Sequence, residues 1–370
     1  MRISYRTRQL LKRLSLVAAI AVMLFIIAWF CSVVFLERYV VYTRDGAMLD
    51  LSISANDIIG EEVAPPSAGT NISIFYNEGD DAINMSDELT KVDGYYIDIN
   101  ALKTDIAGCW DLLEPLNANT PILIDLKGGY GSAYYSSTLP GIITSSEVSV
   151  ASVDELIGYM NEKNFYTIAR ISAFRDYNYG LNHVPAGLMH VNGKGLWPDE
   201  GHCYWLDPTK EMTLEWIASI ITEIKNMGFD EVVLTDFCFP ESDMVRFDGD
   251  KDAALLNAAN WLTQKCGGNK FAISFSVTNH EFPVPEGRSR MYLEKVPATN
   301  VGAVATKVSE TLSEPEVRLV FMAETNDTRF NSYGVLRPLA VAPAIEAQKA
   351  AAATAPTEAT EATTPNGRYG

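Results

Sequence analysis

The chain has 370 residues, which suits one large domain with attachments, because a parallel α/β barrel alone takes about 250 residues. Its formal net charge of −18 at pH 7 and its isoelectric point near 4.6 indicate an acidic surface, which repels phosphates and excludes the nucleic-acid-binding classes. Its 5 cysteines include no CxxC pair, which excludes a disulfide scaffold.

An uncharged stretch from Leu14 to Leu36 is long enough to cross about 30 Å of hydrocarbon. It follows a basic segment, so the positive-inside rule keeps the N-terminus cytoplasmic and predicts that the main domain is extracellular. The stretch is longer than the apolar region of a signal peptide, and no Ala-x-Ala site follows it, so we favour a single-pass anchor in the cell membrane over a cleaved leader. The basic residues are Arg2, Arg6, Arg8, Lys12 and Arg13.

Two segments flank the part of the chain that is able to form a core. Residues 37–68 show little periodicity and end in a run with Pro and Gly, which predicts a stalk. Residues 341–370 consist mainly of Ala, Thr, Pro and Glu, which predicts a disordered tail. We therefore expect a basic segment and membrane anchor at 1–36 and one folded domain at 69–340.

Short apolar runs alternate with amphipathic stretches in the folded domain, which is typical of parallel strands joined by helices. We predict a TIM-like (β/α)8 barrel, and a doubly wound open sheet is the main alternative. No GxGxxG follows the first strand, so the dinucleotide-binding version of that sheet has no support. The predicted strands are 94–100, 121–129, 165–174, 231–237, 271–277, 301–306 and 317–323, with 71–77 as an extra candidate. The predicted helices are 152–162, 209–227 and 251–265.

Charged residues interrupt four of the predicted strands near their ends. Burying such charges singly would cost several kcal/mol, so we expect them to meet one another or a ligand. The alternative is an internal salt-bridge cluster that sets the register of the strands. Two cations just beyond the strands, Lys127 and Arg175, would contact substrate hydroxyls or be solvated. The four interrupting residues are Asp98, Asp125, Arg170 and Asp236.

Carboxylate chemistry is the mechanism that the motifs leave open. The sequence has no GxSxG, HExxH or GxxxxGK[ST] motif. His202, Cys203 and Cys238 do not have zinc-ligand spacing, so we predict no metal and no cofactor. Glycoside hydrolysis needs only two carboxyl groups, one to protonate the departing oxygen and one to act as nucleophile or base. The candidates are Asp236 as one group and Asp125, Glu281 or Glu324 as the other.

An aromatic loop precedes the clearest predicted helix. The flat faces of Trp197, Tyr204 and Trp205, together with His202, suit the stacking of a sugar ring, although the same residues would also serve as hydrophobic cover. Asp207 is followed by a proline, which is the pattern of a helix N-cap, and its alternative role is in substrate binding.

The segments ILIDLKGGYG, FYTIARISAFRD, WLDP and GFDEVVLTDFCFP occur in this order between residues 92 and 240. Together they resemble the bacterial putative glycoside hydrolase domain family, a TIM-barrel group related to the alpha-amylase-like barrels. The resemblance implies a carbohydrate substrate and places Asp236 where related barrels keep a nucleophile. It also implies that four further residues surround the cleft, namely Asp125, Lys127, Arg170 and Asp207.

This chain departs from the family pattern after the fourth strand. The family continues from the aspartate through two residues to Arg-Phe-Pro, whereas Asp236 is followed by Phe237, Cys238, Phe239 and Pro240. The carboxylate therefore lacks a cationic partner in the sequence. We expect a hydrolase of envelope or extracellular carbohydrate, and the alternative is an inactive barrel that binds glycan or a partner protein.

Overall fold

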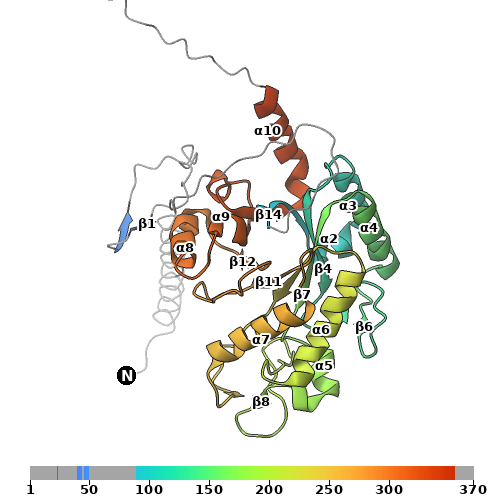
Figure 1. The fold of residues 1–370 in the computed structure, drawn as a ribbon, viewed down its shortest axis with the longest axis vertical. Helices are drawn as coiled ribbons and strands as arrows, with labels where there is room; N and C mark the ends of the chain where they lie inside the picture. The colour runs from blue at the N-terminus through green and yellow to red at the C-terminus, as the bar shows by residue number, and fades with distance from the viewer. Residues whose placement is uncertain (1–22, 24–39, 44–45, 50–88, 355–370) are drawn as a thin grey trace, which may run out of the picture. The chain divides into compact units, whose positions relative to one another are not determined.

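The computed structural model describes residues 23, 40–43, 46–49 and 89–354 (Figure 1). The chain divides into two units, 1–61 and 62–370. The first contains an antiparallel hairpin of β1 (Val40–Thr43) and β2 (Gly46–Leu49). The predicted anchor, apart from Met23, and the extra strand candidate at 71–77 lie outside the described residues. Within the described part of the chain, no helix is both long and apolar enough to span a bilayer.

The second unit is a closed barrel of eight parallel strands, as the sequence predicted. The strand order is β3, β14, β13, β12, β11, β9, β7 and β4, and β4 pairs back with β3 to close the ring. The strands are β3 (Asp93–Ile97), β4 (Pro121–Lys127), β7 (Tyr166–Ser172), β9 (Glu231–Thr235), β11 (Ala272–Ser276), β12 (Met291–Glu294), β13 (Leu319–Met322) and β14 (Gly334–Pro338).

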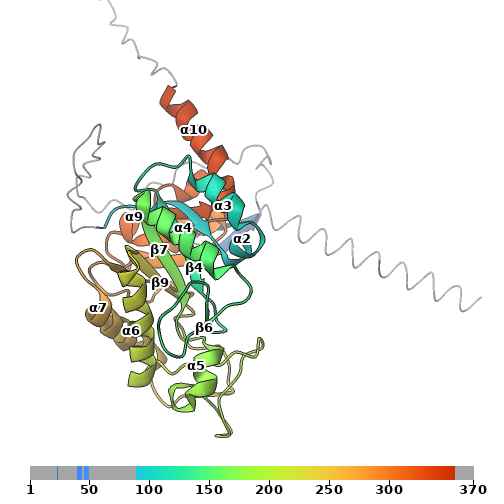
Figure 2. The same ribbon diagram turned by 90° about the vertical axis from the view of Figure 1, so that its right-hand side faces the viewer.

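Helices cover the outside of the barrel, and α3 and α4 lie beside β4 and β7 (Figure 2). The α-helices are α2 (Ile99–Thr104), α3 (Ile106–Leu113), α4 (Val150–Glu162), α5 (Tyr177–Asn182), α6 (Glu211–Asn226), α7 (Lys251–Cys266), α8 (Val301–Val308), α9 (Pro315–Arg318) and α10 (Ala342–Thr354). Among the described residues, short 3-10 turns occur at η1 (Val184–Ala186), η2 (Ala298–Asn300), η3 (Thr328–Phe330) and η4 (Leu339–Val341).

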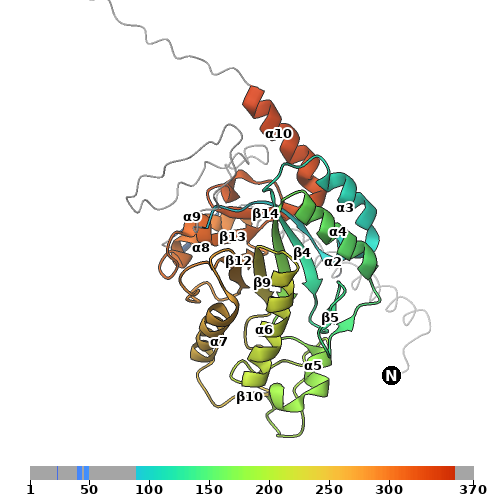
Figure 3. The ribbon, with the colours of Figure 1, turned by 45° about the vertical axis from the view of Figure 1, so that its right-hand side comes forward.

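Small elements extend from the carboxyl ends of the barrel strands. β5 (Ser132–Ala133) and β6 (Ile143–Thr144) follow β4, while β8 (Met189–His190) pairs with β10 (Val245–Arg246). They lie with α5 at the same end of the barrel (Figure 3). Because catalysis in such barrels takes place at the carboxyl ends of the strands, these loops surround the expected site.

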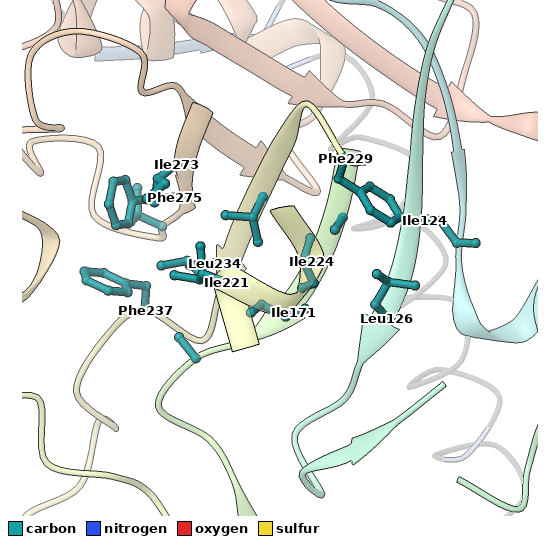
Figure 4. Close-up of a cluster of buried hydrophobic side chains, with 14 of the residues drawn as sticks. Ile124, Leu126, Ile171, Ile221, Ile224, Phe229, Leu234, Phe237, Ile273 and Phe275 are labelled. Atoms are coloured by element: carbon teal, nitrogen blue, oxygen red, sulfur yellow. The ribbon is translucent and has the colours of Figure 1, made fainter. Parts of the chain in front are cut away.

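Two apolar layers hold the barrel together. Alternate residues point inward, and those of the interior cluster include Leu123, Ile168, Val233 and Leu336. The opposite residues pack against the helices, where α6 buries a stripe that includes Ile221 and Ile224 (Figure 4).

A buried polar cluster closes the amino-terminal end of the barrel. The Glu231 carboxylate is fully buried and pairs with the Arg290 guanidinium, which is also buried. It accepts further hydrogen bonds from Ser274 Oγ at 2.5 Å, Tyr292 OH at 2.9 Å and Tyr166 OH at 2.9 Å. Arg290 also donates to Tyr166 OH and to the backbone oxygens of Thr90 and Val317. All these groups satisfy one another, so the cluster is structural.

Three features differ from the sequence prediction. The predicted strand 301–306 is wrong, because its residues begin α8, where Val301, Ala305 and Val308 share one buried helical face. Strands β12 and β14 were not predicted. The predicted disorder is wrong for 342–354, because α10 buries Ala342 and Ile345; residues 355–370 lie outside the described chain.

Candidate active site

A cavity of about 250 Å³ lies at the carboxyl ends of β4, β7, β9 and β12. A larger hollow of about 510 Å³ lies along α6, but there Glu223 is already engaged by the loop at 135–138 and Lys265 by Glu215. The cavity at the strand ends is the candidate active site because three carboxylates line it. Its lining residues are Ile99, Asp125, Lys127, Gly128, Gly129, Tyr134, Arg170, Ser172, Thr235, Asp236 and Glu294.

Asp125 and Arg170 form a cross-strand ion pair on one wall of the cavity. Arg170 Nε lies 2.5 Å from Asp125 Oδ1, and Arg170 Nη2 lies 3.0 Å from Oδ2. The backbone N–H of Ile99 also donates to Asp125 Oδ2, at 2.9 Å. Burial opposes the charge of Arg170, but the Asp125 carboxylate more than offsets this and raises the pKa of the guanidinium. Both oxygens of Asp125 are occupied, so this residue organises the site.

Asp236 follows the end of β9 with a left-handed backbone, at a φ of +50°. Such a conformation is strained for a residue with a side chain, and strain of this kind is concentrated at functional sites. Asp236 Oδ2 accepts a hydrogen bond of 2.6 Å from Ser172 Oγ. Among the described residues, no group donates to Asp236 Oδ1. The carboxylate is therefore fixed by one oxygen and has the other available to a ligand.

Glu294 ends β12 and contributes the third carboxylate. Its side chain is 34% exposed, and its Oε1 accepts from Arg170 Nη1 at 3.2 Å and from Ser276 Oγ at 3.2 Å. Glu294 was not predicted as a site residue, because the strand that it ends, MYLE, has only four residues. The available signal was the short apolar run that ends in a glutamate.

Lys127 lines the cavity, but its ammonium group is already bound by other protein groups. Its ammonium lies 3.0 Å from Asp176 Oδ2 and donates to the backbone oxygen of Ser172 at 2.8 Å. Asp176 is fully buried, and it also accepts hydrogen bonds from Tyr179 N at 2.8 Å and Trp216 Nε1 at 3.2 Å. Lys127 on β4 therefore binds the end of β7. Asp176 was not predicted, because nothing in its local sequence marks it as buried.

The predicted aromatic loop lies beside the cavity, and its residues take different roles. Trp205 is buried and donates to Asp199 Oδ2 at 3.0 Å, and Arg175 Nε pairs with the same oxygen at 2.6 Å. Burial opposes ionisation of Asp199, but the Arg175 and Trp205 hydrogen bonds hold its pKa below the usual value. Trp197 is half-buried, and His202 is exposed with a φ of +59°.

Four of the predicted carboxylates do not line the cavity. Glu281 has a side chain that is 60% exposed and pairs with Lys307 at 3.0 Å. Glu324 is exposed beyond β13, and Asp98 caps α2 through Ala101 N. Asp207 is buried and accepts from Thr209 N at 2.9 Å in a turn before α6, which begins at Glu211 and not at Pro208.

The zinc alternative gains no support from the geometry. Within the parts of the chain that the structure describes, no group of three or more His, Cys, Asp or Glu side chains is placed to hold a metal. Burial raises the pKa of the Cys238 thiol to about 12, and the Asp236 carboxylate acts in the same direction. Cys238 is therefore protonated at neutral pH and is no thiolate nucleophile.

Comparison with known proteins finds a family model that matches the part of the chain containing most of this site. Residues 96–265 match the model of the putative glycosyl hydrolase domain family. The match confirms the family resemblance of the sequence and spans the end of β3 to α7. Glu294 lies outside the matched residues. No curated protein matches the chain.

Several solved structures are similar in fold. A hypothetical protein from Ruminiclostridium thermocellum is 21% identical, with a TM-score of 0.42 over 49% of this chain and 96% of that protein. The GH36 alpha-galactosidase from Geobacillus stearothermophilus is 11% identical, with a TM-score of 0.48 over 72% of this chain. The Flavobacterium johnsoniae chitobiase is 10% identical, with a TM-score of 0.45 over 63% of this chain. This chain spans only 41% and 38% of the lengths of these two enzymes.

Proposed function

We propose that the chain hydrolyses a glycosidic bond in the cavity at the strand ends, with Asp236 as nucleophile or base. The family match supports hydrolysis of a carbohydrate. The observation that carries the assignment is the single hydrogen bond from Ser172, which fixes one oxygen of Asp236 and leaves the other for the substrate. The proposal extends to the cell envelope, because the basic segment and apolar stretch at 1–36 suit a membrane anchor.

Glu294 is the proposed partner of Asp236, in place of Glu281 or Glu324. It lines the same cavity as Asp236, whereas Glu281 is ion-paired with Lys307 on an exposed surface. Arg170 already donates two hydrogen bonds to Asp125, and it donates only one to Glu294, at 3.2 Å. Glu294 Oε2 therefore remains available to protonate the departing oxygen.

The two roles predict different results for two leaving groups. Asp236→Asn should abolish release of sugar from all substrates. Glu294→Gln should suppress hydrolysis of natural oligosaccharides, but it should spare 2,4-dinitrophenyl glycosides, whose leaving group departs without a proton. Initial rates on both classes with the full-length protein measure this. Glu281→Gln is the matched control and should behave as the unaltered chain. Full activity of Asp236→Asn, or equal effects of Glu281→Gln and Glu294→Gln, would contradict the assignment.

A binding protein without hydrolysis is the second candidate. It is favoured by the departure from the family pattern, because the side chains that follow Asp236 are a buried phenylalanine, Phe237, and the protonated Cys238. Residues 237–240 include no cationic side chain. This candidate predicts that the chain binds oligosaccharides without releasing reducing ends, and that Asp236→Asn leaves the dissociation constant unchanged.

A further inference from the structure

We propose that an aromatic platform formed by Tyr130, Tyr177 and Tyr204 is a second sugar-binding subsite, so that the substrate is a neutral polysaccharide chain extending beyond the cavity. This inference rests on the proposed function and specifies the substrate of the same site. The platform is built by the loop after β4, the start of α5 and the loop before Trp205.

The platform is continuous with the cavity. Gly128 and Gly129 line the cavity, and Tyr130 follows them in a turn closed by a hydrogen bond from Gly131 N to Gly128 O at 2.9 Å. The same turn is attached to the start of α5, where Tyr177 N donates to Gly129 O at 3.2 Å. A saccharide that fills the cavity and continues past Gly129 therefore reaches the Tyr130 ring next.

Tyr177 links the three rings, because it is paired with each of the other two. Tyr177 and Tyr204 are stacked, with centroids 5.4 Å apart and an interplanar angle of 7°. The Tyr130 ring is tilted against Tyr177, with centroids 6.2 Å apart. Tyr130 is 57% exposed, although such a large ring would gain from burial. An exposed aromatic ring that continues a stacked pair offers a flat face to the C–H groups of a sugar.

The exposed ring is also held in place before any ligand binds. Tyr130 OH donates to the backbone oxygen of Gly201 at 3.0 Å, which joins the loop after β4 to the loop before Trp205. Arg175 lies between the same loops, since a Cβ built on Gly129 would be 2.5 Å from its Nη1 and one on Gly201 would be 2.6 Å from its Nη2. A rigid ring binds at a lower entropic cost than a mobile one.

The charges at the cavity select a neutral chain. Asp125, Asp236 and Glu294 line it, and its two cations already pair with carboxylates, Arg170 with Asp125 and Lys127 with the buried Asp176. The lining therefore offers no unpaired cation to an acidic sugar. Uronic acids would be repelled from such a site.

The experiment measures how chain length affects the full-length protein and its Tyr130 variants. The probes are neutral cello-, chito- and malto-oligosaccharides from dimer to hexamer, with oligogalacturonates as anionic probes. The readout is the ratio of kcat/KM for the hexamer to that for the dimer, or the ratio of the two association constants if the chain only binds. Tyr130→Ala should lower this ratio about tenfold, which corresponds to roughly 1.4 kcal/mol. Tyr130→Phe keeps the ring and should retain most of the ratio.

The controls separate failure of the subsite from failure of the proposed function. Ile143→Ala removes another exposed apolar side chain, on β6, and should leave the ratio unchanged. An unaltered protein without preference for the hexamer, or an unchanged ratio in Tyr130→Ala, overturns the subsite while hydrolysis or binding stands. A preference for oligogalacturonates overturns the neutral class. If the unaltered protein neither cleaves nor binds any probe, the proposed function and the subsite both fall.

Discussion

Replacement of Arg290 by methionine tests whether the closed end of the barrel depends on its buried ion pair. The Arg290 and Glu231 side chains are 1% and 0% exposed, so methionine would leave a carboxylate in the interior without its cation. Removal of one partner of such a pair costs about 3–5 kcal/mol. Loss of a buried donor to a backbone oxygen adds roughly 1 kcal/mol, and here the oxygens of Thr90 and Val317 both lose one.

Three hydroxyl groups reduce this cost. Ser274, Tyr292 and Tyr166 continue to donate to the Glu231 carboxylate when Arg290 is absent. We therefore expect the net loss in the free energy of unfolding to be about 4 kcal/mol. For a domain of this size about 1 kcal/mol corresponds to roughly 2–4 °C, so Tm should fall by about 10 °C.

Urea unfolding of the full-length chain, followed by circular dichroism, measures the loss. Glu231→Gln combined with Arg290→Met removes the unpaired charge as well, so the double variant should regain about 2 kcal/mol over Arg290→Met alone. Arg246→Met is the control, because Arg246 pairs with Asp248 on an exposed surface, and it should change stability by less than about 0.5 kcal/mol. The reasoning is wrong if Arg290→Met costs less than about 1 kcal/mol or if the double variant is no more stable.

Two further predictions concern the loops around the site. Ser172→Ala removes the hydrogen bond to Asp236 and should lower kcat at least about tenfold with little change in KM. Ser172→Thr keeps a hydroxyl group and should retain the kcat of the unaltered chain. A change confined to KM would contradict this positioning role. Burial opposes ionisation of Asp199, but hydrogen bonds from Arg175 and Trp205 hold its folded pKa below the unfolded value of about 3.9. Its contribution to stability is therefore complete above about pH 4 and is lost as the pH falls through the lower folded pKa. In the unaltered chain, amide hydrogen exchange in the loop around Asp199 should accelerate as the pH falls below about 4. In Asp199→Asn, the same amides should exchange fast at all pH values. Equal pH dependence of exchange in the two proteins would contradict this role of Asp199.

The barrel was predictable from the sequence where its strands are long enough to show a pattern. Strands such as β4 and β7 have seven residues each, most of them apolar, and the amphipathic pattern of α6 predicts its buried face. The stretch at 301–306 was wrongly predicted as a strand, because valine and alanine occur in strands and helices alike. The spacing of its buried residues, which is that of a helix, decides between the two. The four-residue β12 gave too little signal. Its position between β11 and β13 depends on pairing with both, which no local pattern encodes.

The site shows the same division between local and long-range information. Asp125, Lys127, Arg170 and Asp236 interrupt apolar strands, and the structure brings all four to one cavity. The sequence did not reveal that Asp125 and Lys127 are already paired with Arg170 and Asp176. A charge in a strand shows that some partner exists. Only the register of the strands shows which one it is, as the alignment of Asp125 with Arg170 across β4 and β7 does here.

This pairing also explains how a site with so much charge leaves so few groups for chemistry. Each cation in the cavity neutralises a carboxylate that lies behind or beside it, and those carboxylates are in turn fixed by backbone or side-chain donors. Asp236 and Glu294 differ because each is held through one oxygen only. Hydrogen bonds to one oxygen orient the carboxyl group while its second oxygen remains free to meet a substrate. The candidate catalytic residues are therefore the carboxylates that have one oxygen without a hydrogen bond. They are recognised only when every hydrogen bond around the cavity is counted.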